Sequence, residues 1–197
     1  MAFFSFADKK KKKDALRELA RERKKTVLKE QEQKANEEIQ VRLLQSPFFL
    51  EAESIFSYVS VEGEVDTKII LETALQMGKR VFVPRCIPGK ERLMDAVEIH
   101  SMEELSIQYF GLLEPKQEIP ASEERNFDLS LIPCVMADKR GGRLGHGAGY
   151  YDRFLAKAQG KKLCLCFSWY ITDKIPMEEM DIPMDALLTE EGYFSFR

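Results

Sequence analysis

Helical spacing of apolar residues is the dominant pattern in the first 46 positions. Leu16, Leu19 and Ala20 fall on one face of a predicted helix over residues 8–25, whose other positions are mostly charged. Thr26 suits the N-cap of a second helix that runs to about residue 46. The pattern therefore predicts an N-terminal arm of two helices.

Beyond residue 52, short apolar runs alternate with helical patterns. The helix predicted over 66–80 has Asp66 or Thr67 as its N-cap and Gly78 near its end, and a shorter helix is predicted over 150–158. Strands are predicted over residues 53–61, 81–84, 93–99, 128–135, 162–168 and 185–190.

This alternation predicts an α/β fold, a three-layer sandwich with a mostly parallel central sheet and helices on both faces. The run 128–135 is almost continuously apolar, as expected for a central strand buried on both faces. A length of 197 residues fits a single domain over 1–197, with the N-terminal helices in 1–46 and the α/β core in 53–197.

Charge is distributed unevenly along the chain. The net charge is −3, yet residues 1–34 hold twelve Lys and Arg against six Asp and Glu, including the lysine run 9–13. A basic arm is typical of proteins that bind nucleic acid or acidic membranes. Because acids are mixed in and the basic residues follow a helical pattern, a solvated helix face is the simpler interpretation. We expect neither a nucleic-acid nor a membrane partner.

The cysteines and the N-terminus bear on the compartment. The four cysteines form no C-x-x-C pair and are predicted to be free thiols, which indicates a reducing environment. The apolar residues of the N-terminus precede its lysines, the reverse of a secretory signal, and no run approaches the roughly 20 apolar residues of a membrane span. We expect a cytoplasmic protein and a monomer.

Residues 141–149 contain five glycines, directly after the predicted central strand and before a helix. Three of them, Gly145, Gly147 and Gly149, form G-x-G-x-G, which lets backbone amides approach an anion, and Arg143 can add a charged contact to phosphate. The loop lacks the G-K-[ST] of a Walker A motif and the spacing of a dinucleotide fingerprint. Composition alone leaves two interpretations, a phosphate-binding loop or a flexible connection.

The letters R-L-G-H-G-A-G-Y-Y-D over 143–152 resemble the signature of the 5-formyltetrahydrofolate cyclo-ligase family. Other motifs of that family follow in the same order over nearly the whole chain: Lys13 with Arg17, Glu64-Val65-Asp66-Thr67, Val83-Pro84-Arg85, Met94 to Ile99, Phe110 to Pro115, and Asp181 to Asp185. Two positions depart from the common pattern, since some members have Arg where this chain has His146 and Gly or Lys where it has Ala148.

The resemblance implies an enzyme that uses ATP and magnesium to cyclise 5-formyltetrahydrofolate to 5,10-methenyltetrahydrofolate, releasing ADP and phosphate. The formyl oxygen leaves poorly as hydroxide, so transfer of the terminal phosphoryl group to it creates an imidate phosphate with a good leaving group. The nitrogen at position 10 then attacks the formyl carbon and phosphate departs. Such a site must neutralise the triphosphate, align the two reactants and exclude water.

The resemblance also implies roles for individual residues. Arg143 and Tyr151 are expected to be catalytic, and Asp152 and Asp181 to hold magnesium. Folate is expected to contact Val59, Glu64, Phe110 and Tyr150. ATP is expected to contact Lys13, Arg17, Arg143, Leu144, Gly145, His146, Gly147, Ala148, Gly149, Tyr150 and Tyr151. We expect Arg143 near the surface of the ligand site, where its loss leaves stability unchanged.

Each of these residues also has a purely structural interpretation. His146 can be a solvent-facing loop residue, Asp152 a helix cap, Asp181 a turn acid and Phe110 a core residue. Three functional alternatives also remain from the sequence. They are a related ATP-dependent enzyme with another acyl or formyl acceptor, an RNA-binding protein that uses the basic helix, and a structural adaptor, which leaves the glycine loop unexplained.

Overall fold

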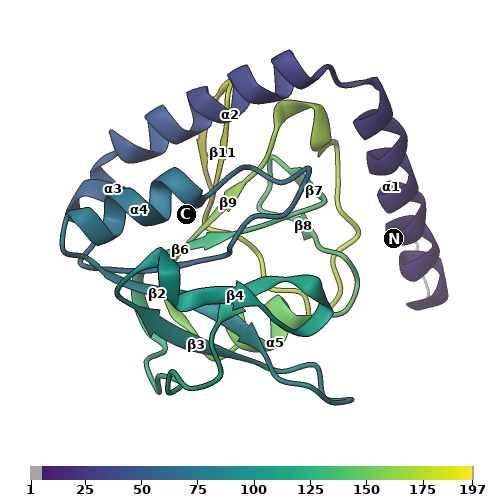
Figure 1. Cartoon of the computed structure of the whole chain (residues 1–197). Helices are drawn as coiled ribbons and strands as arrows, with labels where there is room; N and C mark the ends of the chain where they lie inside the picture. The colour runs from purple at the N-terminus through teal and green to yellow at the C-terminus, as the bar shows by residue number, and fades with distance from the viewer. Residues whose placement is uncertain (1–5, 197) are drawn as a thin grey trace.

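A seven-stranded sheet forms the centre of the molecule (Figure 1). The structure, a computed structural model, describes residues 6–196; the apolar residues 1–5, considered above as a possible signal, lie outside this range, as does residue 197. From edge to edge the strands are β12 (Gly192–Ser195), β11 (Ala186–Thr189), β9 (Gln159–Leu165), β6 (Asn126–Ile132), β1 (Ser54–Ser57), β2 (Arg80–Cys86) and β3 (Met94–Ile99). The strands from β11 to β2 run parallel, and β12 and β3 pair antiparallel at the edges. The predicted α/β fold is confirmed.

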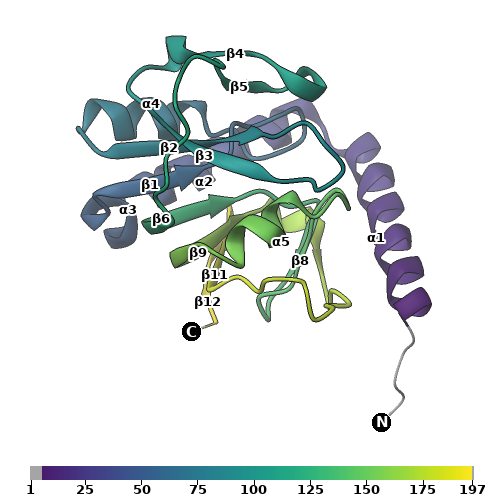
Figure 2. The ribbon, with the colours of Figure 1, turned by 90° about the horizontal axis from the view of Figure 1, so that it is seen from below.

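Helices cover both faces of the sheet (Figure 2). On one face lie α2 (Lys29–Leu44), α3 (Pro47–Glu51) and α4 (Lys68–Gln76), and on the other lies α5 (Tyr150–Leu155). Aromatic rings attach α5 to the sheet: Phe154 stacks on Phe56 with ring centroids 4.6 Å apart, and Phe56 contacts Phe127 at 5.3 Å. All three rings are buried, so this stack is part of the apolar core.

The central strand is the one that its apolar run predicts. β6 is fourth of the seven strands, and its last four residues are buried on both faces. The strand predicted over 53–61 is shorter, because β1 ends at Ser57. The carbonyl of Tyr58 accepts a hydrogen bond from the Thr67 hydroxyl, and the Tyr58 hydroxyl donates to the carbonyl of Val65. These bonds turn residues 58–67 into a loop at the carboxyl end of the strand.

The first helix, α1 (Phe6–Thr26), stands beside the sheet rather than on it (Figures 1 and 2). Its Ala20 is buried, and the Arg23 guanidinium donates to the carbonyl of Trp169 at 2.7 Å. The predicted cap is wrong, because Thr26 is the last residue of α1 and its hydroxyl donates back to the Arg23 carbonyl. The N-cap of α2 is Leu28, which has no side chain able to accept a hydrogen bond.

Two small sheets and three short 3-10 helices were not predicted. One sheet joins β10 (Ile171–Thr172), β7 (Met136–Asp138) and β8 (Arg143–Leu144), and the other joins β4 (Leu105–Ile107) and β5 (Leu113–Pro115). The 3-10 helices are η1 (Met102–Glu104), η2 (Tyr109–Gly111) and η3 (Ser168–Tyr170). These elements are too short for a periodic pattern, yet both small sheets border the site described below.

Gly160 in β9 lies so close to the backbone of Phe127 in β6 that a residue with a side chain does not fit there. Its φ is +93°, and a Cβ atom there would lie 1.6 Å from the carbonyl oxygen of Phe127. Gly160→Ala should therefore lower the free energy of unfolding in urea by more than about 3 kcal/mol, since the change adds a steric clash to backbone strain. Gly78→Ala is the control, because Gly78 has φ +72° with nothing within 4 Å of a Cβ atom. It should cost only the strain, about 1–2 kcal/mol; equal losses in the two variants would contradict the proposed clash.

Candidate active site

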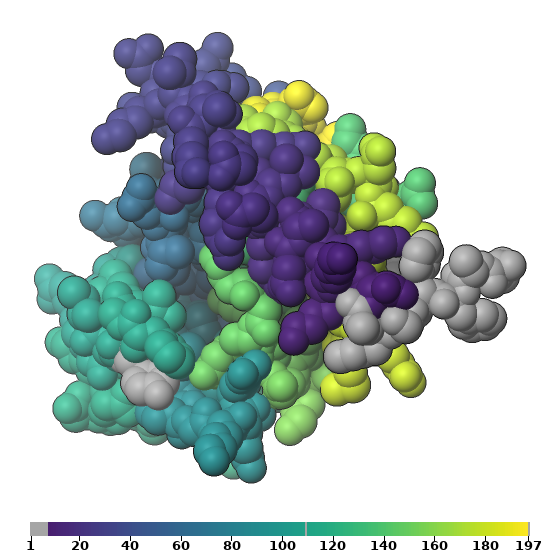
Figure 3. All heavy atoms as spheres, turned by 90° about the vertical axis from the view of Figure 1, so that its right-hand side faces the viewer, coloured from purple at the N-terminus to yellow at the C-terminus, as the bar shows by residue number. Residues whose placement is uncertain are grey.

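A cavity of about 960 Å³ opens at the carboxyl ends of the parallel strands, where α1, the loop after β1 and the glycine loop meet. Figure 3 shows the side of the molecule on which α1 lies next to the green segment that contains the glycine loop. The cavity is lined by every residue that the sequence assigned to a site: Lys13, Arg17, Val59, Glu64, Phe110, Asp181 and the whole of 143–152. Residues up to 168 positions apart thus converge on one space.

The glycine loop, residues 141–149, is held at its start by the buried side chain of Asp138. The Asp138 carboxylate accepts backbone hydrogen bonds from Arg140, Gly142 and Ile175 at 2.7–2.9 Å. Gly142 packs so closely that a Cβ atom would lie 2.4 Å from Asp138 Oδ2. The loop then continues through β8 to Gly149, whose φ of +76° turns the chain into α5.

Two cations of α1 line the cavity, and one of them contacts this loop. Arg17 Nε donates to the carbonyl of Gly145 at 3.0 Å, and a Cβ atom on Gly147 would lie 3.1 Å from the Arg17 guanidinium. Lys13 Nζ donates to carboxylate oxygens of Glu178 and Asp181, each at 2.6 Å. The helical spacing of Lys13 and Arg17 thus places both on the cavity side of α1, as expected from residues four apart.

Lys13 remains a cation although its side chain is only 10% exposed. Burial by itself lowers the pKa of Lys13, but the hydrogen bonds to Asp181 and Glu178 outweigh burial and raise the pKa above 10.5. The cavity therefore keeps a fixed positive charge at this wall at every physiological pH.

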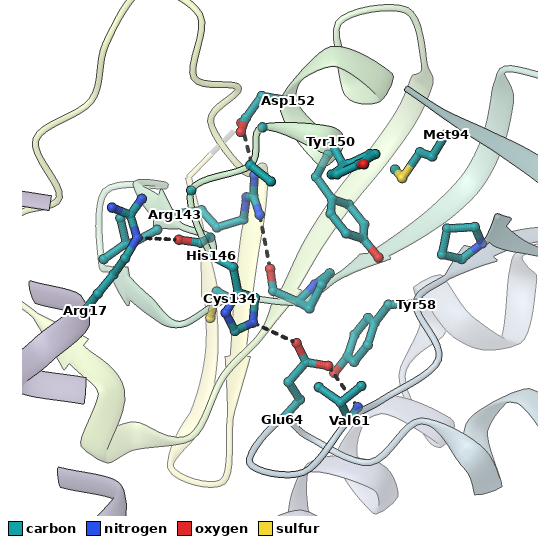
Figure 4. A pocket seen from close by; sticks show the side chains of 18 of the residues that line it. Arg17, Tyr58, Val61, Glu64, Met94, Cys134, Arg143, His146, Tyr150 and Asp152 are labelled. Carbon is teal, nitrogen blue, oxygen red and sulfur yellow. Dashed lines mark hydrogen bonds and ion pairs between the residues drawn. The ribbon is translucent and has the colours of Figure 1, made fainter. Parts of the chain in front are cut away.

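Arg143 lies much deeper than expected. Its side chain is 3% exposed, and it donates to the carbonyl of Pro133 at 3.2 Å and to Asp152 Oδ1 at 3.0 Å (Figure 4). The expectation of a surface position is wrong, because β8 places the guanidinium beneath the glycine loop. Asp152 Oδ1 also accepts the backbone N–H of Ile182, which brings Asp152 next to Asp181.

Glu64 reaches the cavity from the loop after β1 (Figure 4). Its Oε2 accepts the backbone N–H of Val61 at 3.1 Å, and its Oε1 lies 3.6 Å from Nε2 of His146. The Glu64 side chain is 12% exposed, whereas His146 is 74% exposed. Glu64 is therefore no solvent-facing loop acid, and His146 is the solvent-facing loop residue that its sequence position suggested.

Aromatic residues complete the walls. Burial, and then the charge of Glu64, raise the pKa of Tyr151 well above 10, so its phenol stays protonated and can act as a hydrogen-bond donor. The rings of Phe110 and Tyr150 meet edge to face with centroids 6.4 Å apart. Phe110 is 64% exposed, which excludes the interpretation as a core residue. The cavity therefore combines a basic glycine-rich side with flat aromatic surfaces.

Comparison with known proteins decides between the functional interpretations. The model of the 5-formyltetrahydrofolate cyclo-ligase family matches residues 9–190. The chain belongs to this family. The resemblance seen in the sequence is confirmed, and the chain is an enzyme of the ligase class.

Relatives within the family come from distant organisms. A probable 5-formyltetrahydrofolate cyclo-ligase of Caenorhabditis elegans is 33% identical over 177 residues, covering 83% of this chain and 85% of the relative. The 5-formyltetrahydrofolate cyclo-ligase of Escherichia coli K12 is 30% identical over 178 residues, covering 87% of this chain and 96% of its own.

Solved structures share the fold. The 5,10-methenyltetrahydrofolate synthetase of Aquifex aeolicus superposes with a TM-score of 0.83 at 28% identity, covering 94% of this chain and 93% of its own. A 5,10-methenyltetrahydrofolate synthetase of Mycoplasma pneumoniae, at 21% identity and a TM-score of 0.67, covers 90% of this chain and 98% of its own and supports the fold alone.

Sequence reasoning missed three carboxylates that shape this cyclo-ligase cavity. They are Asp138, which holds the glycine loop, Glu178, which shares Lys13 with Asp181, and Glu114, which lines the cavity from β5. Glu114 lies within the F-G-L-L-E-P motif, so the resemblance pointed at its segment without singling it out. Two donors to Asp138 are near in sequence, but the third, Ile175, is distant, as is Lys13, the partner of Glu178. No local pattern identifies the distant partners.

The burial of Arg143 generates a stability prediction. Arg143→Ala should lower the free energy of unfolding in urea by about 1–3 kcal/mol, because it removes the donor to the Pro133 carbonyl and the charged donor to the Asp152 carboxylate. Arg153→Ala is the matched control: Arg153 is exposed and donates to the carbonyl of Ala148 at 3.0 Å, so its loss should stay within about 0.5 kcal/mol. Equal stabilities of the Arg143 variant and the wild type would refute the buried role.

Proposed function

We propose that the chain converts 5-formyltetrahydrofolate to 5,10-methenyltetrahydrofolate at the expense of ATP, which leaves as ADP and phosphate. The observation that carries the proposal is the two-sided character of one cavity. Basic side chains and the glycine loop line one side, and aromatic and apolar side chains line the other. A triphosphate and a flat pterin need these two environments side by side.

The glycine side suits the triphosphate. Lys13 and Arg17 face the loop from α1, and the bare backbone of Gly145 and Gly147 allows an anion to approach the main chain. The buried Arg143 supports the loop from below and has its Nε inside the protein without a hydrogen-bond partner among the described residues. We infer that this nitrogen provides a further donor toward the bound substrates.

The residues present fit a magnesium ion in that same region. Magnesium is commonly held by one or two carboxylates together with substrate phosphates. Asp152 and Asp181 both line the cavity, and in each of them one oxygen takes the hydrogen bonds to protein while the other is left for ligation. Asp152 and Asp181 are therefore the residues that would hold the ion, which supplies positive charge that neutralises the triphosphate.

The chemistry that we propose follows from the formyl group. The formyl oxygen attacks the terminal phosphorus, the bond from that phosphorus to the bridging oxygen breaks, and ADP leaves with those electrons. The nitrogen at position 10 then attacks the formyl carbon and loses its proton, and the carbon–oxygen bond breaks to release phosphate. Tyr151, as a neutral phenol, can donate a hydrogen bond to the substrate during these steps.

The four cysteines are free, as predicted, which is consistent with the cytoplasm that we propose as the compartment. Among the described residues no helix is long and apolar enough to cross a membrane. A monomer remains our expectation, since the cavity is lined from within one chain.

The proposal predicts strict coupling between nucleotide and cyclisation. Purified protein mixed with ATP, magnesium and 5-formyltetrahydrofolate should form the methenyl product, followed by its near-ultraviolet absorbance, and release one phosphate per product molecule. Removing ATP or adding a chelator should abolish both signals, because the formyl oxygen then has no means to leave. Product formation at the full rate without nucleotide would falsify the mechanism.

Glu64 is predicted to recognise folate rather than nucleotide. Glu64→Gln keeps the volume but replaces an acceptor by a donor, so it should weaken binding of 5-formyltetrahydrofolate by about tenfold to a hundredfold. Nucleotide affinity, titrated without folate, should stay within about twofold because distant sites behave additively. Glu62→Gln is the control, since the Glu62 side chain is 93% exposed two residues away. Equal folate affinity in the Glu64 variant and wild type would remove Glu64 from the folate site.

A further inference from the structure

The cavity contains a buried carboxylate whose position the reaction described above does not explain. Glu114 lies on β5, in the small sheet that packs beside β2, and is 3% exposed. Its Oε1 accepts the backbone N–H of Cys86 at 3.0 Å. Its Oε2 is buried and has no hydrogen-bond partner among the residues whose side chains the structure describes. Glu114 therefore has one oxygen that the protein satisfies and one that it does not.

This arrangement is unfavourable for the empty protein. A buried carboxylate is costly unless it is paired with a cation or fully hydrogen-bonded. The structure gives Glu114 no ion pair within the described part of the chain; the neighbouring Arg85 instead donates to the carbonyls of Lys116 and Ile119. Burial, and then a side-chain hydrogen bond with Glu114, raise the pKa of the Cys86 thiol to about 12, so this neighbour is a neutral thiol and offers Glu114 only a weak S–H donor. A ligand donor is the missing partner.

The surroundings of Glu114 indicate the kind of ligand. The backbone N–H of Cys86 donates to Glu114 Oε1, and Cys86 is the cross-strand partner of Met94. Met94 lies at the end of the cavity far from Arg17 (Figure 4). Pro84, Leu113 and Met94 make this end of the cavity largely apolar. An apolar slot with one unsatisfied acceptor at its wall suits a flat heterocycle that carries an N–H or amino group at its edge.

We propose that Glu114 binds the exocyclic amino group of the reduced pterin ring of the substrate. The proposal rests on the function proposed above, under which the substrate carries a 2-aminopyrimidinone ring with donors along one edge. A carboxylate is an acceptor-only group when ionised, and an unsatisfied buried acceptor discriminates strongly against analogues that lack the donor. Glu64, whose oxygens contact Val61 and the glycine-loop His146, lies nearer the phosphate side and serves another part of the folate.

A cycle that combines a protein change with a ligand change tests this pairing. Wild type and Glu114→Gln are each titrated, without ATP, with 5-formyltetrahydrofolate and with its 2-desamino analogue, in which hydrogen replaces the amino group. We expect wild type to lose about tenfold to a hundredfold in affinity on removal of the amino group. Glu114→Gln should bind the parent compound as weakly, and should lose little more with the analogue, because the two changes remove the same contact.

Matched variants distinguish the loss of the contact with the amino group from a general disturbance of the pocket. Glu118→Gln changes an exposed carboxylate four residues along the same segment and should bind like wild type. Glu64→Gln should lose affinity by the same factor for both ligands, because its contact is elsewhere on the folate. Glu114→Asp keeps the charge but withdraws it by one methylene, so it should show the same coupling as Glu114→Gln and serves if the amide variant does not fold.

Two results overturn the proposal. The first is that Glu114→Gln binds the parent compound as tightly as wild type does, which would mean that Glu114 only accepts the backbone hydrogen bond of Cys86. The second is that Glu114→Gln loses affinity by the same factor for the parent compound and for the 2-desamino analogue, relative to wild type. This result would mean that the change disturbs the whole pocket rather than one contact. Failure of the proposed function gives a different result: wild type then binds neither compound and forms no methenyl product in the presence of ATP and magnesium.

Discussion

Asp138 accepts three backbone hydrogen bonds with a carboxylate that is almost wholly buried, and the geometry of the site follows from them. Two of these bonds close the turn between β7 and β8, and the third, from Ile175, ties in the segment that continues to Asp181. A carboxylate with several N–H donors tolerates burial because the donors replace its water. Asp138 therefore links the glycine loop to the segment that contains Asp181, although the loop and this segment are far apart in sequence.

Three of the cations that line the cavity are engaged with acids before any ligand arrives. Lys13 is bonded to Asp181 and Glu178, Arg17 to Asp14, and Arg143 to Asp152. A polyanionic ligand has to exchange with these acids rather than fill an uncompensated positive pocket. These ion pairs stabilise the empty site, since isolated buried charges are far more costly than paired ones. Under the proposed function, the exchange also places the acids released from the cations next to the triphosphate, where a divalent cation would take over the pairing.

The architecture and the location of the site could be predicted, because both depend on local patterns. The continuous apolar run identified β6, and the glycine density before a helix identified the loop that lines the cavity. The burial of Arg143 could not be predicted. It depends on the Pro133 carbonyl and on Asp152, which tertiary structure brings to the same guanidinium. Likewise the start of α2 could not be predicted: the capping preference indicated Thr26, whereas α1 continues through Thr26 and Leu28 precedes α2.

The β4–β5 hairpin shapes the wall of the cavity that the proposed function assigns to folate. Phe110, between the two strands, has φ +62°, a conformation that a non-glycine residue adopts at a cost and that persists where the surrounding structure holds it. Gly111 follows with φ +71°. Together these two residues reverse the chain so that the ring of Phe110 stands exposed opposite Tyr150 while β5 returns along β4. That return directs Glu114 inward, against Cys86. The strained turn therefore supplies the cavity with both an aromatic wall and a buried acceptor.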